Sequence, residues 1–341
     1  MGYRMAKALL SALVIAGCST TTTFPTVPAA VAPAARSGAL PDAKAPPSVY
    51  WTLFASCSYP QVQHAALPLK STTTAKNEYC STHNGLSYSS GLHVDSSGRL
   101  WVLNFGAHSG SPGSVSVFNL PFKTDVPTPE YTFVLSGTSD PDHLTFDRSG
   151  NLWVSSHNSD VTKYKGPFTK SGTLSPAITL TNGISRPSGI AVDPSGNVYV
   201  ADFTSTGTNS IAVFKTPISN KPAYYLKGLT QPGGLAFDKS GNLYASENGP
   251  STYAIVRYNS GDLKRGDVPS IADATGLSST YESDFAFGPS GDLYFANCGD
   301  TGSVYEYPTS KEQFSSSLAP SLDYTNADLQ QAGCAWGIAI K

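Results

Sequence analysis

Polar residues that could do chemistry stand at the ends of five similar segments of this sequence. One copy reads GIAVDPSGNVYVAD, and the five copies end at Asn104, Ser156–His157, Asp202, Glu247 and Asn297. A second polar set stands where the copies start and includes Asp142, His143, Glu282, Asp284 and Trp336. Carboxylate and amide oxygens are ligands for Ca²⁺ or Mg²⁺. The imidazole of His143 or His157 could act as a general base.

This chemistry requires that residues far apart in the sequence converge, so the elements that carry them matter. In the quoted copy, residues 189–192 and 198–201 alternate in the manner of β-strands. Between them, Asp193-Pro194-Ser195-Gly196-Asn197 predicts a tight turn. Pro presets φ, Asp can accept backbone N–H groups ahead of it, and Gly can take the left-handed conformation. Each copy therefore predicts a β-hairpin.

Two more strands follow each hairpin. The third strands are predicted at 114–120, 160–166, 210–216, 253–259 and 303–309, and weaker fourth strands at 130–136, 175–181, 221–227, 268–274 and 320–326. Four strands in 45 to 53 residues is the size of one blade of a β-propeller. Radial stacking would bury both faces of each sheet, which explains why the unit is repeated.

The spacing of the turns predicts six blades, an all-β fold, and a closure made by both ends of the chain. The next turn after the one at Gly288 would fall at Lys341, so residues 335–341 give only the first strand of a last blade. Residues 48–56 are predicted to supply its second strand, and His64 to Asn84 its outer strands. A seventh blade would need a hidden repeat within this last stretch, which is too short. The predicted propeller spans 48–341.

The repeated pattern G-[IL]-A-[VF]-D-x-S-G-N-[LV]-[YW]-V resembles the NHL-repeat and SMP-30-like six-bladed β-propellers, over about 48–341. That group includes binding scaffolds, lactonases with a metal on the central axis, and lyases that open cyclic lactone antibiotics. The resemblance implies that the ends of the second strands and the starts of the first strands gather at one mouth of the axis. The ligand-binding candidates there are Asn104, His143, His157, Asp202, Glu247, Asp284 and Asn297.

The resemblance also offers a structural alternative for these positions. In NHL-like repeats, an Asp or Asn after the second strand often binds the backbone of the adjoining loop, and Asn104, Asp202 and Asn297 occupy that register. Glu247 is a rarer choice there and is the strongest single functional candidate. His143 replaces the Gly of its sister copies. The metal or His/Glu sets of the lactonases and lyases do not align residue by residue with this chain.

Four cysteines remain after Cys18, namely Cys57, Cys80, Cys298 and Cys334. An even number in an exported protein predicts two disulfides. Propeller topology places all four near the closure between the chain ends. We favour the pairs Cys57–Cys80 and Cys298–Cys334 among three possible pairings. A zinc site is the alternative, although no CxxC spacing supports it.

The first eighteen residues predict export. Arg4 and Lys7 precede a short apolar run, the pattern of a secretory signal. Ile15-Ala16-Gly17-Cys18 resembles the lipobox of bacterial lipoproteins, in which the Cys thiol receives the lipid; the alternative is an ordinary signal peptide with an incidental Cys. By the same resemblance, Ser19 suggests the outer membrane. Residues 19–47 are rich in Thr, Ala and Pro and predict a disordered tether.

The net charge of the chain and the motifs that it lacks limit the classes of function that it could have. The formal net charge is -2, and the absence of a long Lys/Arg run argues against nucleic-acid binding. The chain has no HExxH, GxSxG, phosphate loop or EF-hand loop. We therefore expect a lipid-anchored binding scaffold at the cell envelope, whose partner is an envelope protein or a small molecule. The alternative is a metal-dependent hydrolase or lyase, lactonase-like, with one divalent cation (Ca²⁺ or Mg²⁺) at the central mouth.

Overall fold

The computed structural model describes 46–53, 60–81, 83–105, 112–157, 160–203, 209–248, 253–264, 266, 271–272, 284–298, 302–307, 321–332 and 334–341. The compact unit runs from Pro46 to Lys341. The predicted signal peptide with Cys18, and all but the last two residues of the predicted tether, lie outside the described residues. The described helices include none that is long and apolar enough to cross a membrane.

The five predicted hairpins are all present. Their strands are β4 (Ser89–Val94) with β5 (Arg99–Asn104), β8 (Pro141–Phe146) with β9 (Leu152–Ser156), β13 (Pro187–Val192) with β14 (Val198–Asp202), β17 (Pro232–Phe237) with β18 (Leu243–Asn248), and β21 (Phe285–Phe287) with β22 (Leu293–Asn297). Each pair is antiparallel. We number the blades one to five in this order.

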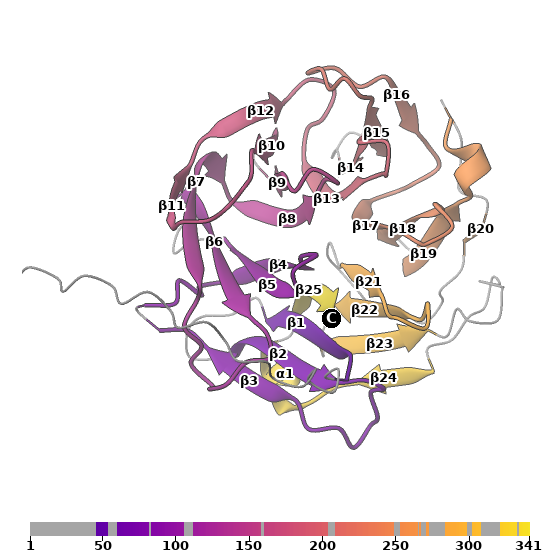
Figure 1. Ribbon diagram of the computed structural model, residues 1–341. Coiled ribbons are helices and arrows are strands. Elements are labelled where there is room, and N and C mark those ends of the chain that lie inside the picture. The colour runs from indigo at the N-terminus through magenta and orange to yellow at the C-terminus, as the bar shows by residue number, and fades with distance from the viewer. Residues whose placement is uncertain are drawn as a thin grey trace, which may run out of the picture. The chain divides into compact units, whose positions relative to one another are not determined.

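The predicted third and fourth strands are confirmed as well. The third strands are β6 (Pro112–Asn119), β10 (Asp160–Tyr164), β15 (Ser210–Phe214), β19 (Tyr253–Tyr258) and β23 (Ser303–Tyr307); the fourth are β7 (Tyr131–Ser139), β12 (Pro176–Leu180), β16 (Tyr224–Leu226), β20 (Ile271–Ala272) and β24 (Leu322–Tyr324). A short 3-10 helix, Ser260–Asp262, follows β19. The described residues form six sheets around a central axis, the predicted six-bladed β-propeller (Figure 1).

One strand was not predicted. The strand β11 (Gly172–Leu174) belongs to the connection between the third and fourth strands of blade two, yet it pairs in parallel with β7 of blade one. Blade one therefore has five strands in the order β11-β7-β6-β5-β4. The pairing of β11 with β7 covers the outer edge of β7, which would otherwise present unpaired backbone groups.

The hairpin turns form by the predicted chemistry. Oδ1 of Asp193 accepts the backbone N–H groups of Ser195 at 2.8 Å and Asn197 at 2.9 Å. Gly196 adopts the left-handed conformation with φ of 82°. The turns that begin at Asp95, Asp147 and Asp238 repeat these two bonds. The forward-reaching carboxylate and the Gly three positions later therefore stabilise the turn in these four copies.

Blade six is closed by the two ends of the chain, as the repeat spacing predicts. Its sheet has the order β25-β1-β2-β3, with β25 (Ala335–Ile340), β1 (Ser48–Leu53), β2 (Pro60–Ala66) and β3 (Lys76–Tyr79). Val49 lies opposite Ile340 and Trp51 opposite Ile338. The short helix α1 (Ala327–Ala332) fastens this blade to blade five, because Oδ2 of Asp328 accepts bonds from Gln63 and Asn77 at 3.1 and 3.0 Å.

Neighbouring blades approach closely at the start of their first strands. A Cβ on Gly189 would lie 2.2 Å from the carbonyl oxygen of Gly233, which explains the Gly at this register. Hydroxyl groups also bridge the blades: Ser90 Oγ donates to the carbonyl of Pro141 at 3.1 Å, and Ser188 Oγ to that of Pro232 at 3.0 Å. The buried cores likewise lie between blades; one joins Tyr199 of blade three to Leu235 of blade four.

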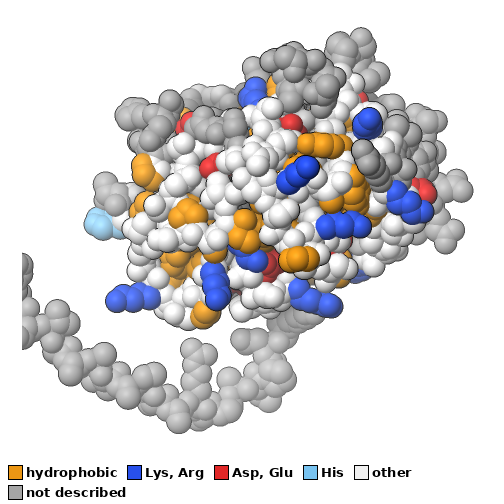
Figure 2. Space-filling view, turned by 90° about the horizontal axis from the view of Figure 1, so that it is seen from above, with side chains coloured by type: hydrophobic (Ala, Val, Ile, Leu, Met, Phe, Trp, Pro, Cys, Tyr) orange, Lys and Arg blue, Asp and Glu red, His pale blue; other side chains and the backbone are white. Residues whose placement is uncertain are grey.

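The outer face over blades two and three is basic, although the whole chain is slightly acidic. Exposed lysines there are Lys165, Lys170, Lys215, Lys221 and Lys227. Figure 2 looks onto the side where β12 and β16 lie in Figure 1 and shows Lys and Arg side chains spread among hydrophobic ones, with few acidic groups. The lysines are dispersed rather than packed into one stripe.

Candidate functional site at the axial mouth

Two blades depart from the Gly register at the start of the first strand. Gly91, Gly189, Gly234 and Gly337 hold this position in blades one, three, four and six. His143 holds it in blade two and Asp284 in blade five. Because blades two and five are opposite in a ring of six, the two side chains face each other across the axis. His143 Nε2 lies 4.0 Å from Asp284 Oδ1.

Asp142, the residue before His143, is the centre of the site. Its Oδ2 lies 3.0 Å from Nδ1 of His143 and 3.1 Å from Nε2 of His157. Its Oδ1 accepts the indole N–H of Trp336 at 2.8 Å. Asp142 is 1% exposed and His143 is 3% exposed. Such a buried carboxylate is held only because several donors surround it.

Local backbone geometry sets the two histidines around this carboxylate. Asp140 lies in the left-handed region with φ of 50°, which is uncommon for a residue with a side chain. Its carbonyl oxygen accepts the backbone N–H of His157 at 3.1 Å. The ring of Phe105 from blade one meets the ring of His157 edge-on at 6.4 Å. His157 is therefore held at the rim, with its side chain 18% exposed.

The two carboxyl groups of the site have opposite pKa shifts. Burial raises the pKa of Asp142, but the adjacent His143 and His157 outweigh it and hold this pKa well below the ordinary 3.8. Burial also raises the pKa of Asp284, here to about 6, against the opposing effects of His143 and of the backbone N–H groups of Phe285 and Ile338. Carboxyl groups with separated pKa values can take different roles in one site.

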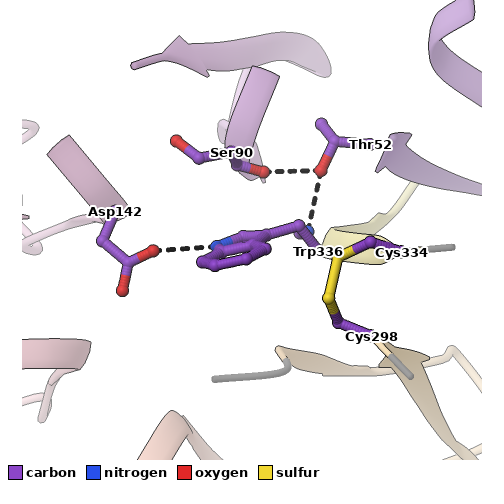
Figure 3. Close-up of a disulfide and its surroundings, with 7 residues drawn as sticks. Thr52, Ser90, Asp142, Cys298, Cys334 and Trp336 are labelled. Atoms are coloured by element: carbon purple, nitrogen blue, oxygen red, sulfur yellow. Dashed lines mark hydrogen bonds between the residues drawn. A yellow bond between two sulfur atoms is a disulfide. The ribbon is translucent and has the colours of Figure 1, made fainter. Parts of the chain in front are cut away.

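A disulfide supports the Trp336 side of the mouth. Cys298 follows β22 and Cys334 precedes β25, and their sulfur atoms are bonded as predicted. Figure 3 shows the disulfide beside Trp336, whose indole points to Asp142. In the same view, Thr52 Oγ1 donates to the carbonyl of Ser90 at 2.6 Å and accepts the N–H of Gly337 at 2.8 Å. Cys80 is also disulfide-bonded, but its predicted partner Cys57 lies outside the described residues.

Of the four remaining candidates, Asp202, Glu247 and Asn104 accept hydrogen bonds from loop backbone next to their own strands. Asp202 accepts the N–H groups of Ser185 at 2.7 Å and Arg186 at 2.8 Å. Glu247, the strongest candidate from sequence, accepts the N–H of Thr230 at 2.8 Å. Asn104 accepts the hydroxyl of Ser89 and the N–H of Ser87. Asn297 is fully buried at the end of β22. These contacts are those of the structural alternative, and ligand binding by these four residues stays a prediction.

No group of three or more His, Cys, Asp or Glu in the described part of the chain is arranged to hold a metal ion. Asp202 and Glu247 direct carboxylate oxygens to loop backbone, and Asp142 is surrounded by nitrogen donors. The described residues therefore provide a hydrogen-bonded acid–base cluster rather than a cage of oxygen ligands. A divalent cation at the mouth remains an expectation from the sequence.

A cavity of about 410 Å³ runs along the axis below the mouth and is lined by the first strands of all six blades. His143 and Asp284 line its mouth end. His93, which the sequence patterns did not mark as a candidate, lines this cavity and a second one of about 690 Å³ between the turns of blades one and two. A signal was present: the same register holds only Thr145, Ala191, Ala236, Ala286 and Ala339 in the other blades.

Comparisons with known proteins agree with this architecture. Residues 185–214, which form the start of blade three, match the sequence model of the NHL repeat. No curated protein sequence matches the chain. The matched repeat and the six sheets together establish a β-propeller that contains an NHL repeat.

Among solved structures, the chain is similar to a candidate 6-phosphogluconolactonase from Bacteroides uniformis, with 14% identity, a TM-score of 0.55, and coverage of 82% of this chain and 83% of that chain. It is similar to a protein of unknown function from Bacteroides caccae, with 10% identity, a TM-score of 0.54, and coverage of 86% and 98%. It is also similar to the WD40 propeller domain of Doa1, with 13% identity, a TM-score of 0.52, and coverage of 84% and 80%. At these identities the likeness concerns the fold alone.

Proposed function

We propose that this protein is exported, anchored by a lipid on Cys18, and acts as a binding scaffold whose contact site is the axial mouth around Asp142. The N-terminal pattern supports the anchor, because a positive start and a short apolar run precede Ile15-Ala16-Gly17-Cys18. Residues 19–47 would space the propeller from the membrane surface. The partner is an envelope protein or a small molecule.

One observation carries the choice of the mouth: Asp142 replaces a residue that the fold uses for assembly. At this register Ser90 and Ser188 bridge to the next blade through their hydroxyl groups. Asp142 instead gathers two imidazoles and an indole from blades two and six. A buried carboxylate is costly to desolvate, and the other blades have no carboxylate at this register. We therefore assign the cluster to binding rather than to folding.

The anchor is tested by following lipid attachment in cells. The intact chain should incorporate an alkyne-labelled fatty acid and fractionate with membranes. The Cys18→Ser chain should carry no label and should not fractionate with membranes. Cys57→Ser is the matched cysteine control and should keep the label. Equal labelling of the Cys18→Ser chain, or no labelling of the intact chain, would contradict the lipid anchor.

The mouth is tested by photocrosslinking from a residue on its rim. Phe105, whose ring meets that of His157 edge-on, is replaced by p-benzoylphenylalanine, which places a photoreactive aromatic group at the same position. The control carries the same amino acid at Val126, which is 48% exposed in the connection between β6 and β7. We expect a discrete adduct from position 105 that disappears when Asp142→Asn is added. Equal adducts from both positions, or none from position 105, would refute the mouth as the contact site.

A second candidate function is acid–base catalysis at the same mouth, as a hydrolase or lyase. It is favoured by Asp142 and His157, because a carboxylate that binds one ring nitrogen orients an imidazole for proton transfer. A screen of lactones with the chain from Ser19 onward, before and after chelation, tests it. Turnover lost in His157→Gln supports catalysis, and turnover lost on chelation supports the metal-dependent form. If no lactone is turned over, the binding scaffold remains the proposed function.

A further inference from the structure

The axial cavity has a distinct chemical character at each level. The first strands run from the mouth downward, and three residues separate the Gly register from the strand ends, about 10 Å along the strand. At the strand ends, all six blades place a large apolar side chain in the wall: Val94, Phe146, Val192, Phe237, Phe287 and Ile340. We call this ring the collar. Its members are half-buried.

The mouth end of the cavity carries a carboxyl group. Asp284 lines the cavity, and its side chain is 13% exposed. Its Oδ1 accepts the N–H of Phe285 at 2.8 Å, and His143 from the opposite blade is 4.0 Å away. Asp142 adds negative charge nearby, which disfavours the ionised form of Asp284. A positive group placed in the cavity would offset the electrostatic cost of ionising Asp284.

The middle of the cavity carries an imidazole. His93 stands where the other blades have Ala or Thr, and its ring lies 5.2 Å from that of Phe146. Burial lowers the pKa of His93 to about 4, so the ring is neutral at physiological pH. A neutral imidazole accepts a hydrogen bond and does not repel a cation.

We propose that the axial cavity binds a small organic ammonium ion, with its charged nitrogen toward Asp284 and His93 and its aromatic or short alkyl body within the collar. Carboxylate and aromatic rings are the groups that recognise such cations. The volume of about 410 Å³ falls within the range of small-molecule sites, about 300–1,000 Å³. The proposal does not depend on a partner at the mouth, because it uses Asp284, His93 and the collar, whereas the proposed contact site is the cluster around Asp142.

The chemistry of the walls selects against other ligands. An anion would meet Asp284 and the nearby Asp142, while His143, which also lines the cavity, is already paired with Asp142 at 3.0 Å. A wholly apolar molecule would strip water from a carboxyl group without replacing it. Three of the collar residues that line the cavity are aromatic, namely Phe146, Phe237 and Phe287.

The experiment titrates the chain from Ser19, which keeps every described residue, with 2-phenylethylammonium and follows ligand NMR signals by saturation transfer. The neutral isostere 2-phenylethanol is the matched ligand control. We expect a dissociation constant at or below about 1 mM, weakened about tenfold or more in Asp284→Asn and about threefold in Phe237→Leu. Because the charged form of Asp284 is required, binding should weaken below pH 6.

Two control variants locate the site and separate this proposal from the one at the mouth. Asp323→Asn removes an exposed carboxylate on β24 and should leave binding unchanged. The second control is run at the mouth: Phe237→Leu changes the cavity wall and should keep the crosslinked adduct from position 105. No saturation transfer at about 10 mM, equal binding of 2-phenylethanol, or unchanged binding in Asp284→Asn would overturn the proposal. Thermal unfolding of each variant verifies that the fold is kept.

Discussion

At the scale of single residues, the chemistry of this protein resides in the departures from its own repeat. His143 and Asp284 stand where four blades have Gly, and Asp142 stands where three blades have Ser. His93 replaces the Ala or Thr of the other blades. Repeated positions serve the fold, so a change to an ionisable residue that is buried adds a desolvation cost without a packing gain. Such positions are the natural candidates for function.

The raised pKa of Asp284 gives a prediction with a defined pH window. A carboxyl group whose pKa is 3.8 when unfolded and about 6 when folded weakens folding as pH rises through this interval. Asp284→Asn removes the ionisation. We expect equal stability of the two proteins near pH 4 and a variant more stable by up to about 3 kcal/mol at pH 8. Urea unfolding over this pH range measures the difference.

The control for this prediction is Asp323→Asn, which changes an exposed carboxylate on the outer strand of blade five. Its stability should follow that of the unmodified chain at every pH. A difference that is as large at pH 4 as at pH 8 would mean that Asn acts by packing and that Asp284 does not titrate as described.

At the scale of elements, Gly189 shows what holds one blade against the next. A Cβ there would lie 2.2 Å from the carbonyl of Gly233 and 2.7 Å from the backbone nitrogen of Leu235. These atoms belong to a first strand and cannot move aside without opening the interface. The register that carries His143 and Asp284 is therefore under a steric constraint in blade three.

We expect Gly189→Ala to lose about 3 kcal/mol or more of unfolding free energy, or to prevent accumulation of folded protein. Gly261→Ala is the matched control, because nothing lies within 4 Å of a Cβ at that position. It should change stability by less than about 0.5 kcal/mol. Chemical denaturation of both variants measures the effect. Similar losses of unfolding free energy in the two variants would show that the close approach between blades three and four does not determine stability.

At the scale of the whole molecule, the ring depends on how its ends are joined. The strand β25 from the C-terminus supplies the inner strand of blade six, and β1 from the N-terminus lies beside it. The Cys298–Cys334 disulfide ties β25 to blade five across 36 residues of sequence. Cross-linking a loop of this length restricts the unfolded chain.

Removing this disulfide should therefore destabilise the closure. We expect Cys298→Ser with Cys334→Ser to lose about 2–4 kcal/mol of unfolding free energy. The measurement is urea unfolding without reductant, so that the disulfide of Cys80 stays intact, with Trp336 emission as a local probe. Stability within about 0.5 kcal/mol of the unmodified chain would show that β-sheet pairing alone closes the ring.

The sequence by itself determined the architecture, because the hairpin turns are local. Asp193 and Gly196 lie within one turn, so the bonds they make follow from the order of residues alone. The spacing of these turns also predicted six blades and a last blade shared by the two chain ends. The favoured Cys298–Cys334 pair followed from the same ring topology and is confirmed.

Only the tertiary structure decided which polar residues meet. Glu247 looked the most distinctive in the sequence, yet its carboxylate holds the backbone of Thr230. Asp142 and His157 of blade two meet Trp336 of blade six, and His143 meets Asp284 because six blades place the second opposite the fifth. Ring geometry relates residues separated by more than a hundred positions, and no local pattern encodes that distance. The burial that shifts the pKa of Asp284 and His93 is likewise a property of the assembled ring.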